Sequence, residues 1–206
     1  MKGRVLFWVR DAQLPTGANR CNVLSCHCGR CRPPAAQCGA LPVRIEVDDL
    51  SRPAVVALLA EHLQSMHALS PPGSVHALNL DGLRSGGVTF WTAWDDGGLA
   101  GCAALKELSP THGEIKSMRT PALRRRLGAG RTLLAHLIEE AHRRGYHRLS
   151  LETGSTPAFA AAHRLYEAFG FVACGPFGDY REDPHSLFMS RSLVGDRTGA
   201  ASAGSD

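Results

Sequence analysis

The chain has 206 residues, of which 44% are hydrophobic and 20% are charged. This composition is typical of a globular protein, the length suffices for one domain with a sizeable core, and a collagenous chain is excluded. No apolar run approaches the ~18–20 residues that cross a bilayer, so the sequence indicates no integral membrane protein. The net charge of +4 and the seven cysteines are compatible with a nucleic-acid or metal partner, so their positions along the chain matter.

The first 42 residues differ from the rest of the chain. They hold six Lys and Arg residues against one acidic residue, and five of the seven cysteines. The cysteines, with His27 among them, are zinc-ligand types but lack two separated C-x2-C pairs, so zinc binding is the less favoured interpretation. The apolar run at 5–9 is too short for a secretory signal, and scarce serine disfavours a transit peptide. We expect residues 1–42 to be a disordered arm, or to lie upstream of a true start near Leu41 or Val43.

The sequence after this extension predicts regular elements from the spacing of apolar residues. A strand over 44–48 is followed by a helix that Ser51 could cap and that residues 71–73 end. A shorter helix or turn is expected over 75–83. The Asp-Asp-Gly-Gly turn at 95–98 then joins the first two strands of a meander. The meander strands are predicted over 88–94, 99–108 and 114–119.

The second half of the domain alternates helices with strands. The predicted elements are a helix over 131–144, a strand over 148–152, a helix over 157–168, and strands over 171–174 and 186–192. Gly145 and Gly170 follow the two helices, as is common at helix ends. Residues 194–206, rich in Gly, Ala and Ser, are predicted to be a disordered tail. The order of elements predicts an α+β sheet domain with one strand–loop–helix crossover in its middle.

The crossover loop carries the clearest functional signal. Residues 118–134 contain five arginines and no acidic residue, and Gly128 and Gly130 stand where the next helix begins. Glycine lets the backbone approach a ligand closely, and the first amides of a helix are unpaired and partly positive. Together these features favour a pyrophosphate site. The segment is neither a P-loop nor the dinucleotide fingerprint, and a solvated basic turn is the alternative interpretation.

Two motifs resemble those of the GNAT N-acetyltransferase superfamily. The hexapeptide RRLGAG at 125–130 resembles its R/Q-x-x-G-x-G/A motif, and LYEAFGF at 165–171 resembles its LYxxxGF. The resemblance covers residues 43–193. It implies a mixed, mostly antiparallel sheet of six to seven strands flanked by about four helices, with the fourth and fifth strands splayed apart. It also implies a small, cytoplasmic, bacterial-type N-acetyltransferase with acetyl-CoA as co-substrate and a primary amine as acceptor.

The resemblance further implies which residues bind acetyl-CoA. Backbone amides of residues 126–131, which we call the glycine loop, would hold the pyrophosphate. Neighbouring arginines would add positive charge, and the fourth strand would pair with the pantetheine arm. Many family members carry Asn after the fifth strand, whereas residues 153–157 here read TGSTP, and Ser155 or Thr156 could replace that contact. The expected cofactor-binding residues are Met118, Arg119, Arg125, Arg126, Leu127, Gly128, Ala129, Gly130, Arg131 and Ser155.

Direct transfer requires a base for the acceptor ammonium and an acid for the leaving thiolate. Glu114 aligns with the strand-borne glutamate base of histone-type members, with an exposed strand-edge residue as the alternative. Glu152 is the rival base, or a residue for substrate binding or an internal ion pair. Tyr166 matches the tyrosine that protonates the CoA sulfur, with a core tyrosine as the alternative. Cys102 and Cys174 lie in apolar strands and are expected to be buried and unreactive.

The acceptor is expected to bind beside the polar loop at 177–185. Asp179, Glu182 and Asp183 there could attract a cationic amine, or form a solvated loop, and Arg181 could pair with a carboxylate. A small metabolite and a peptide amine both fit. Two other classes of function stay open. One is a non-catalytic acyl-CoA-binding module, and the other, less favoured, is a protein that binds nucleic acid through the basic residues 1–42. We expect no metal and no membrane partner, while folds of this kind often form homodimers.

Overall fold

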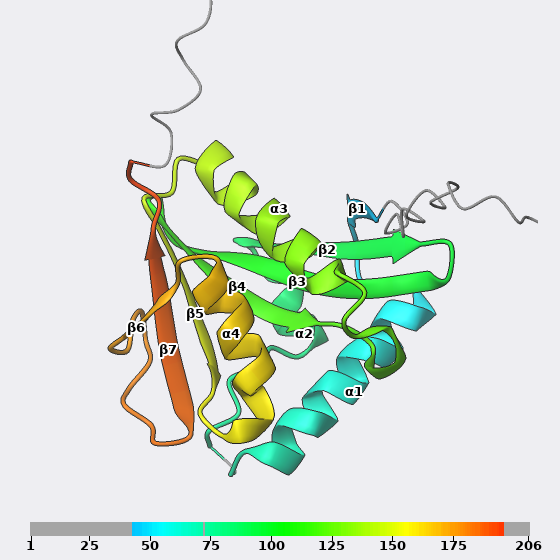
Figure 1. Ribbon diagram of the computed structural model, residues 1–206, viewed down its shortest axis with the longest axis horizontal. Coiled ribbons are helices and arrows are strands. Elements are labelled where there is room, and N and C mark those ends of the chain that lie inside the picture. The colour runs from blue at the N-terminus through cyan, green and yellow to red at the C-terminus, as the bar shows by residue number, and fades with distance from the viewer. Residues whose placement is uncertain (1–42, 72, 196–206) are drawn as a thin grey trace, which may run out of the picture. The chain divides into compact units, whose positions relative to one another are not determined.

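The structure, a computed structural model, describes residues 43–71 and 73–195 (Figure 1). Its strands are β1 (Arg44–Val47), β2 (Val88–Asp95), β3 (Gly98–Ser109), β4 (His112–Arg119), β5 (Arg148–Gly154), β6 (Val172–Cys174) and β7 (Ser186–Ser192). Its helices are α1 (Pro53–Leu69), α2 (Leu80–Leu83), α3 (Ala129–Arg143) and α4 (Ala160–Ala168), with 3-10 turns at Ala122–Arg124 and Pro157–Phe159. The predicted α+β fold is therefore confirmed over these residues.

All seven strands belong to one sheet with the order β1-β2-β3-β4-β5-β7-β6. Neighbouring strands run antiparallel except for β4 and β5, which are parallel. A parallel pair needs a crossover connection, and the loop and α3 between β4 and β5 supply it. The cysteine-rich extension predicted for residues 1–42, and residues 196–206 of the predicted tail, lie outside the described residues.

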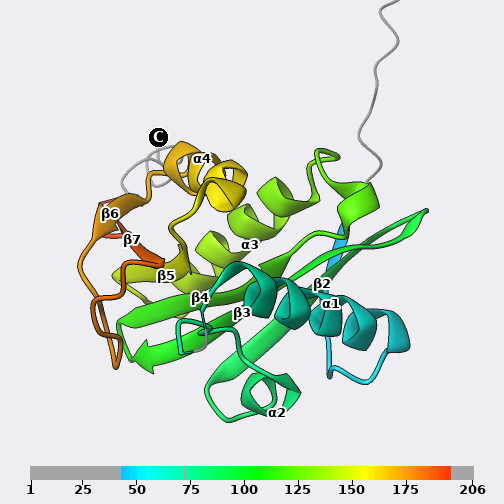
Figure 2. The same cartoon turned by 90° about the horizontal axis from the view of Figure 1, so that it is seen from below.

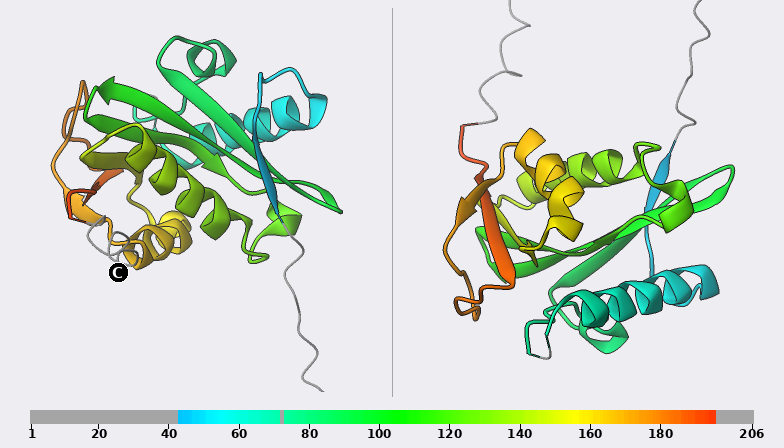
Figure 3. Two further views of the ribbon diagram at one scale, coloured as in Figure 1. Left: turned by 90° about the horizontal axis from the view of Figure 1, so that it is seen from above. Right: turned by 60° about the horizontal axis from the view of Figure 1, so that its bottom comes forward.

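Helices cover both faces of the sheet. α3 and α4 lie on one face, and α1 and α2 lie on the other (Figures 2 and 3). Successive residues of β3 point to opposite faces, so Leu105 packs in the α3 core while Cys102 and Ala104 pack with Val55 of α1. This two-sided burial explains why β3 reads as a continuous apolar run. No helix in the described part of the chain is long and apolar enough to cross a membrane.

The predicted start of α1 is wrong, and the segment predicted over 75–83 as a helix or turn is helical in part. The N-cap of α1 is Arg52 rather than Ser51, and no side chain caps this helix. The Asp49 carboxylate instead accepts the Ser51 amide at 2.9 Å, so the residues before α1 form a side-chain-bonded turn. Within the segment predicted over 75–83, only Leu80–Leu83 is helical, and Asn79 caps it by accepting the Gly82 amide at 2.8 Å.

The sheet opens between β4 and β5, as expected from the resemblance. Their pairing runs from His112 to Ile115 within the residues that the structure describes, after which β5 continues against β7. The ladder between β3 and β4 shifts register beyond Lys116, and Ser117 there has a φ of +49°. This is a β-bulge, which bends a strand and re-aims its backbone groups. The last residues of β4 therefore present an edge without a β5 partner.

Candidate functional site

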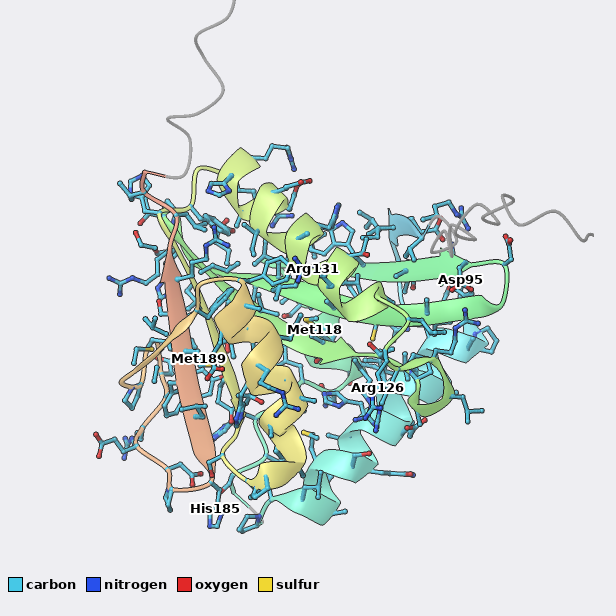
Figure 4. The ribbon with its side chains drawn as sticks, viewed as in Figure 1. Asp95, Met118, Arg126, Arg131, His185 and Met189 are labelled. Atoms are coloured by element: carbon cyan, nitrogen blue, oxygen red, sulfur yellow. The ribbon has the colours of Figure 1, made fainter. Side chains whose placement is uncertain are left out.

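A cavity of about 820 Å³ lies where β4 and β5 diverge. We call it the larger cavity; its walls come from α1, the segment 74–77, the end of β4, the glycine loop, the end of β5 and α4. Figure 4 shows Met118, Arg126 and Arg131 around the region where β4 leads into α3. Among the residues predicted to bind the cofactor, eight line this cavity: Met118, Arg119, Arg125, Arg126, Gly128, Ala129, Gly130 and Arg131.

The other two predicted cofactor residues lie outside the larger cavity. Leu127 is 58% exposed and does not line it. Ser155 donates its hydroxyl to the carbonyl of Pro184 at 2.8 Å. This bond ties the end of β5 to the loop before β7, so the Ser155 hydroxyl is already engaged.

The start of α3 presents free backbone amides to the larger cavity. Gly128 is the N-cap with a φ of +93°, and no side chain caps the helix. The first helical hydrogen bond runs from the Thr132 amide to the Gly128 carbonyl at 3.0 Å. The amides of residues 129–131 therefore have no intrahelical acceptor, which leaves them available to an anion at the positive end of a 15-residue helix.

The arginines beside this helix start are not equally available. Arg119 pairs with Glu61 of α1 at 3.0 Å, and Arg124 forms an ion pair with Asp95 of the β2–β3 hairpin. Arg131 lies 5.0 Å over the ring of Phe169. Two further arginines, Arg125 and Arg126, form no ion pair with any described residue. They are the cations best placed to meet a phosphate group.

Tyr166 lines the larger cavity from α4. It is 7% exposed, and its hydroxyl lies 3.9 Å from the Sδ atom of Met118. Burial raises the pKa of Tyr166 to about 12, so its phenol stays protonated at neutral pH. A protonated hydroxyl at the end of β4 can donate to a developing anion there.

Glu152 reaches the same cavity from β5. Its carboxylate accepts a 2.7 Å hydrogen bond from the Ser186 hydroxyl of β7. Burial raises the pKa of Glu152, because desolvation disfavours the charged carboxylate. Tyr166, expected from the LYxxxGF motif, and Glu152, expected from the fifth strand, thus line the same cavity.

Glu114 lies in a second, smaller pocket of about 530 Å³, bounded by β3, β4 and the loop at 178–184. Glu114 is 1% exposed, so the alternative of an exposed strand-edge residue is wrong. The Tyr180 hydroxyl donates to the Glu114 carboxylate at 2.5 Å, and Lys116 lies 3.3 Å from the same oxygen. His76 lines both the smaller pocket and the larger cavity, so the two adjoin.

Three residues of this cluster were not predicted from the sequence. Lys116 donates to the Tyr180 hydroxyl at 2.5 Å and to the His76 carbonyl at 2.9 Å. The pKa of Tyr180 is raised, mainly because the phenol is buried and secondly because Glu114 places a negative charge beside it. Lys116 could have been found, because it follows Glu114 by two positions and therefore shares its face of β4. Tyr180 lies in the loop at 177–185 that was expected to border the acceptor, although no pattern marked this residue, and His76 lies in an irregular segment without a sequence signal.

The two cysteines in the described part of the chain differ in their exposure to solvent. Cys102 is buried, and burial raises the pKa of its thiol to about 12, which makes it unreactive as predicted. Cys174 is exposed, so its predicted burial is wrong. It stands in β6, a three-residue edge strand whose residues are all exposed. Among the described residues, no group of three or more His, Cys, Asp or Glu side chains could hold a metal ion.

Comparisons with known proteins point to one family. The family model described as acetyltransferase (GNAT) family matches residues 55–171. The chain is 56% identical to the uncharacterized N-acetyltransferase YsnE of Bacillus subtilis (strain 168), over 73% of this chain and 100% of that protein. It is 50% identical to the uncharacterized N-acetyltransferase YedL of Escherichia coli (strain K12), over 72% of this chain and 94% of that protein.

The fold is shared with solved structures. A Klebsiella pneumoniae protein described as an acyl-CoA N-acyltransferase superposes with a TM-score of 0.59 at 27% identity. The match covers 73% of this chain and 97% of that one. The predicted fold family is therefore confirmed by structure as well as by sequence.

Proposed function

Because the chain belongs to the GNAT acetyltransferase family, we propose that it transfers the acetyl group of acetyl-CoA to a primary amine by direct attack in a ternary complex. The observation that carries this proposal is the adjoining of two pockets at the splay of β4 and β5. One presents helix amides and unpaired arginines, and the other contains a buried carboxylate. They suit an anionic cofactor and an amine, respectively.

The larger cavity is proposed to hold acetyl-CoA, which supplies the activated acetyl thioester. The amides of residues 129–131 would bind its pyrophosphate, and Arg125 and Arg126 would add positive charge. The edge of β4 beyond Ile115 would pair with the amide groups of the pantetheine arm, as a further strand would. In support, the helix start lacks a side-chain cap that would occupy its amides.

Glu114 is proposed as the base. It lines the smaller pocket, where an acceptor ammonium could reach its carboxylate. Glu114 would take one proton from the ammonium, and the neutral amine would attack the thioester carbon. The nitrogen–carbon bond then forms while the carbon–sulfur bond breaks. Tyr166 would protonate the leaving thiolate, and the second proton of the nitrogen would return through water to Tyr166.

Substitution of Tyr166 by Phe tests the acid. We expect the kcat for CoA release to fall by about 10²–10⁴-fold. The KM for acetyl-CoA should hardly change, because the ring keeps its packing 6.0 Å from Phe171. Since the pKa of Tyr166 is about 12, deprotonation of this group should not lower the wild-type rate at moderately alkaline pH.

Tyr146→Phe provides the matched control. Tyr146 is 3% exposed, its hydroxyl donates to Glu107 at 3.0 Å, and it lines neither pocket. Its substitution should leave kcat unchanged. A Tyr166→Phe enzyme that turns over like the wild type would remove Tyr166 from the mechanism.

We further propose that residues 43–193 form the catalytic domain of a cytoplasmic enzyme that acts on a small-molecule or peptide amine. A non-catalytic acyl-CoA-binding module would share the larger cavity. It would not need the buried Glu114 beside an acceptor pocket. Activity assays on the Glu114 and Tyr166 variants therefore separate these two functions.

A further inference from the structure

We propose that the acceptor is an amine that also carries a carboxylate, and that Lys106 and Arg181 bind this carboxylate in the smaller pocket. The inference rests on the proposed function, because it assumes that the smaller pocket takes the acceptor. It adds the chemical class of the acceptor and two residues that select it.

The first argument is the position of Lys106 relative to Glu114. The two residues are directly paired across the β3–β4 ladder and both line the smaller pocket. Lys116 follows Glu114 on the same face of β4 and lines the larger cavity, whereas Leu108 follows Lys106 in the opposite direction. An amine beside Glu114 is therefore close to the cofactor, and the rest of the acceptor extends toward Lys106 and Leu108.

The second argument is that the charge of Lys106 is not compensated within the described residues. Lys116 already has Glu114 at 3.3 Å and two hydrogen-bond acceptors. Lys106, half-buried in the pocket wall, forms no ion pair and no side-chain hydrogen bond with any described residue, and the same holds for Arg181. An ammonium and a guanidinium facing one pocket are donors that a carboxylate accepts in charge-assisted hydrogen bonds.

The third argument is that the pocket carries charges of both signs, which suits an amino acid better than a purely cationic acceptor such as a polyamine. Inside the pocket the one carboxylate of β4, that of Glu114, already has Lys116 and Tyr180 as partners. A second ammonium would meet Lys106 and be repelled. Three further acids line the pocket from the loop at 178–184: half-buried Asp183 accepts the His185 amide at 2.8 Å, and exposed Asp179 and Glu182 would attract the reacting ammonium at the entrance. Lys106 of β3 and Arg181 of the loop thus supply positive charge beside acidic groups, and a small amino acid, which carries one group of each sign, fits these charges and the volume of about 530 Å³.

The test uses the full-length protein, acetyl-CoA and a panel of L-amino acids. Each amino acid is assayed for CoA release beside its primary amide and its decarboxylated amine. We expect at least one amino acid to be acetylated with a kcat/KM about 10–100-fold above that of its primary amide and of its decarboxylated amine, which both lack the carboxylate.

Lys106→Met should raise the KM for that amino acid by about 10–100-fold, with little change in kcat or in the KM for acetyl-CoA. Its rates with the amide and the amine should not fall. Lys106→Arg should retain the preference, because it keeps the charge. Arg164→Met is the control, since Arg164 is exposed on α4 and lines neither pocket.

The outcomes distinguish this inference from the function on which it rests. Acetylation of amines without any preference for a carboxylate would overturn the inference and leave the acetyltransferase function intact. A preference that survives in Lys106→Met and in Arg181→Met would overturn the assignment of these residues. No transfer to any member of the panel, with acetyl-CoA still bound, would contradict both the proposed amine acetylation and the inference.

Discussion

Gly128→Glu is expected to abolish the binding of acetyl-CoA while the protein remains folded. Gly128 has a φ of +93° and a Cβ atom there would meet nothing within 4 Å, so a side chain has space but strains the backbone by about 1–2 kcal/mol. A carboxylate at this position would compete for the amides of residues 129–131 and repel the phosphates. We expect the Kd measured by isothermal titration to rise by more than about 100-fold.

Gly145→Glu is the matched control for this substitution. Gly145 has a φ of +78°, a Cβ atom there would also meet nothing within 4 Å, and it follows α3 at the opposite end from Gly128. The backbone strain and the added charge are therefore similar, but the residue lines neither pocket. If both variants lost acetyl-CoA equally, or if Gly128→Glu bound it normally, the glycine loop would not be the pyrophosphate site.

Glu114→Gln is expected to lower kcat by about 10²–10⁴-fold without weakening the binding of acetyl-CoA. Glutamine has the shape of glutamate and can still accept the hydrogen bond of Tyr180, but it cannot take a proton from an ammonium. The substitution also leaves Lys116 without its carboxylate partner in a buried site, so the melting temperature should fall. Rates are therefore to be compared well below the melting temperature of the variant.

Glu152→Gln separates the two candidate bases. Glu152 lines the larger cavity and is held by Ser186, so its substitution should reduce kcat less than that of Glu114. A larger loss in Glu152→Gln than in Glu114→Gln would assign the base to Glu152. Equal activity of wild type and Glu114→Gln would remove Glu114 from the mechanism.

The sequence predicted the elements and the glycine loop because both depend on short-range patterns. The turn at 95–98 between β2 and β3, the helical spacing in α3, and the hexapeptide at 125–130 are all visible within a few residues. The charge of the loop depends instead on distant residues. Glu61 and Asp95, which neutralise Arg119 and Arg124, lie 58 and 29 positions away along the chain.

The sequence predicted that the loop at 177–185 borders the acceptor, but the contacts that build the pocket could not be predicted, for the same reason. Tyr180 is 66 positions from Glu114, in a loop between β6 and β7, and its position beside the carboxylate depends on the pairing of these strands with β5. The segment before α2 also runs without regular structure, and His76 from this segment joins the cluster through its backbone carbonyl. Tertiary packing places these groups, and no local pattern encodes it.

The central claim is that the larger cavity binds acetyl-CoA, and thermal unfolding with and without acetyl-CoA tests it most directly. A ligand that binds only the folded state stabilises it, by about 2.7 kcal/mol at a hundredfold excess over Kd. For a chain of this size we expect the melting temperature to rise by about 5–10 °C in the wild type and in Gly145→Glu, and not in Gly128→Glu. An unchanged wild-type melting temperature at millimolar acetyl-CoA would contradict the claim.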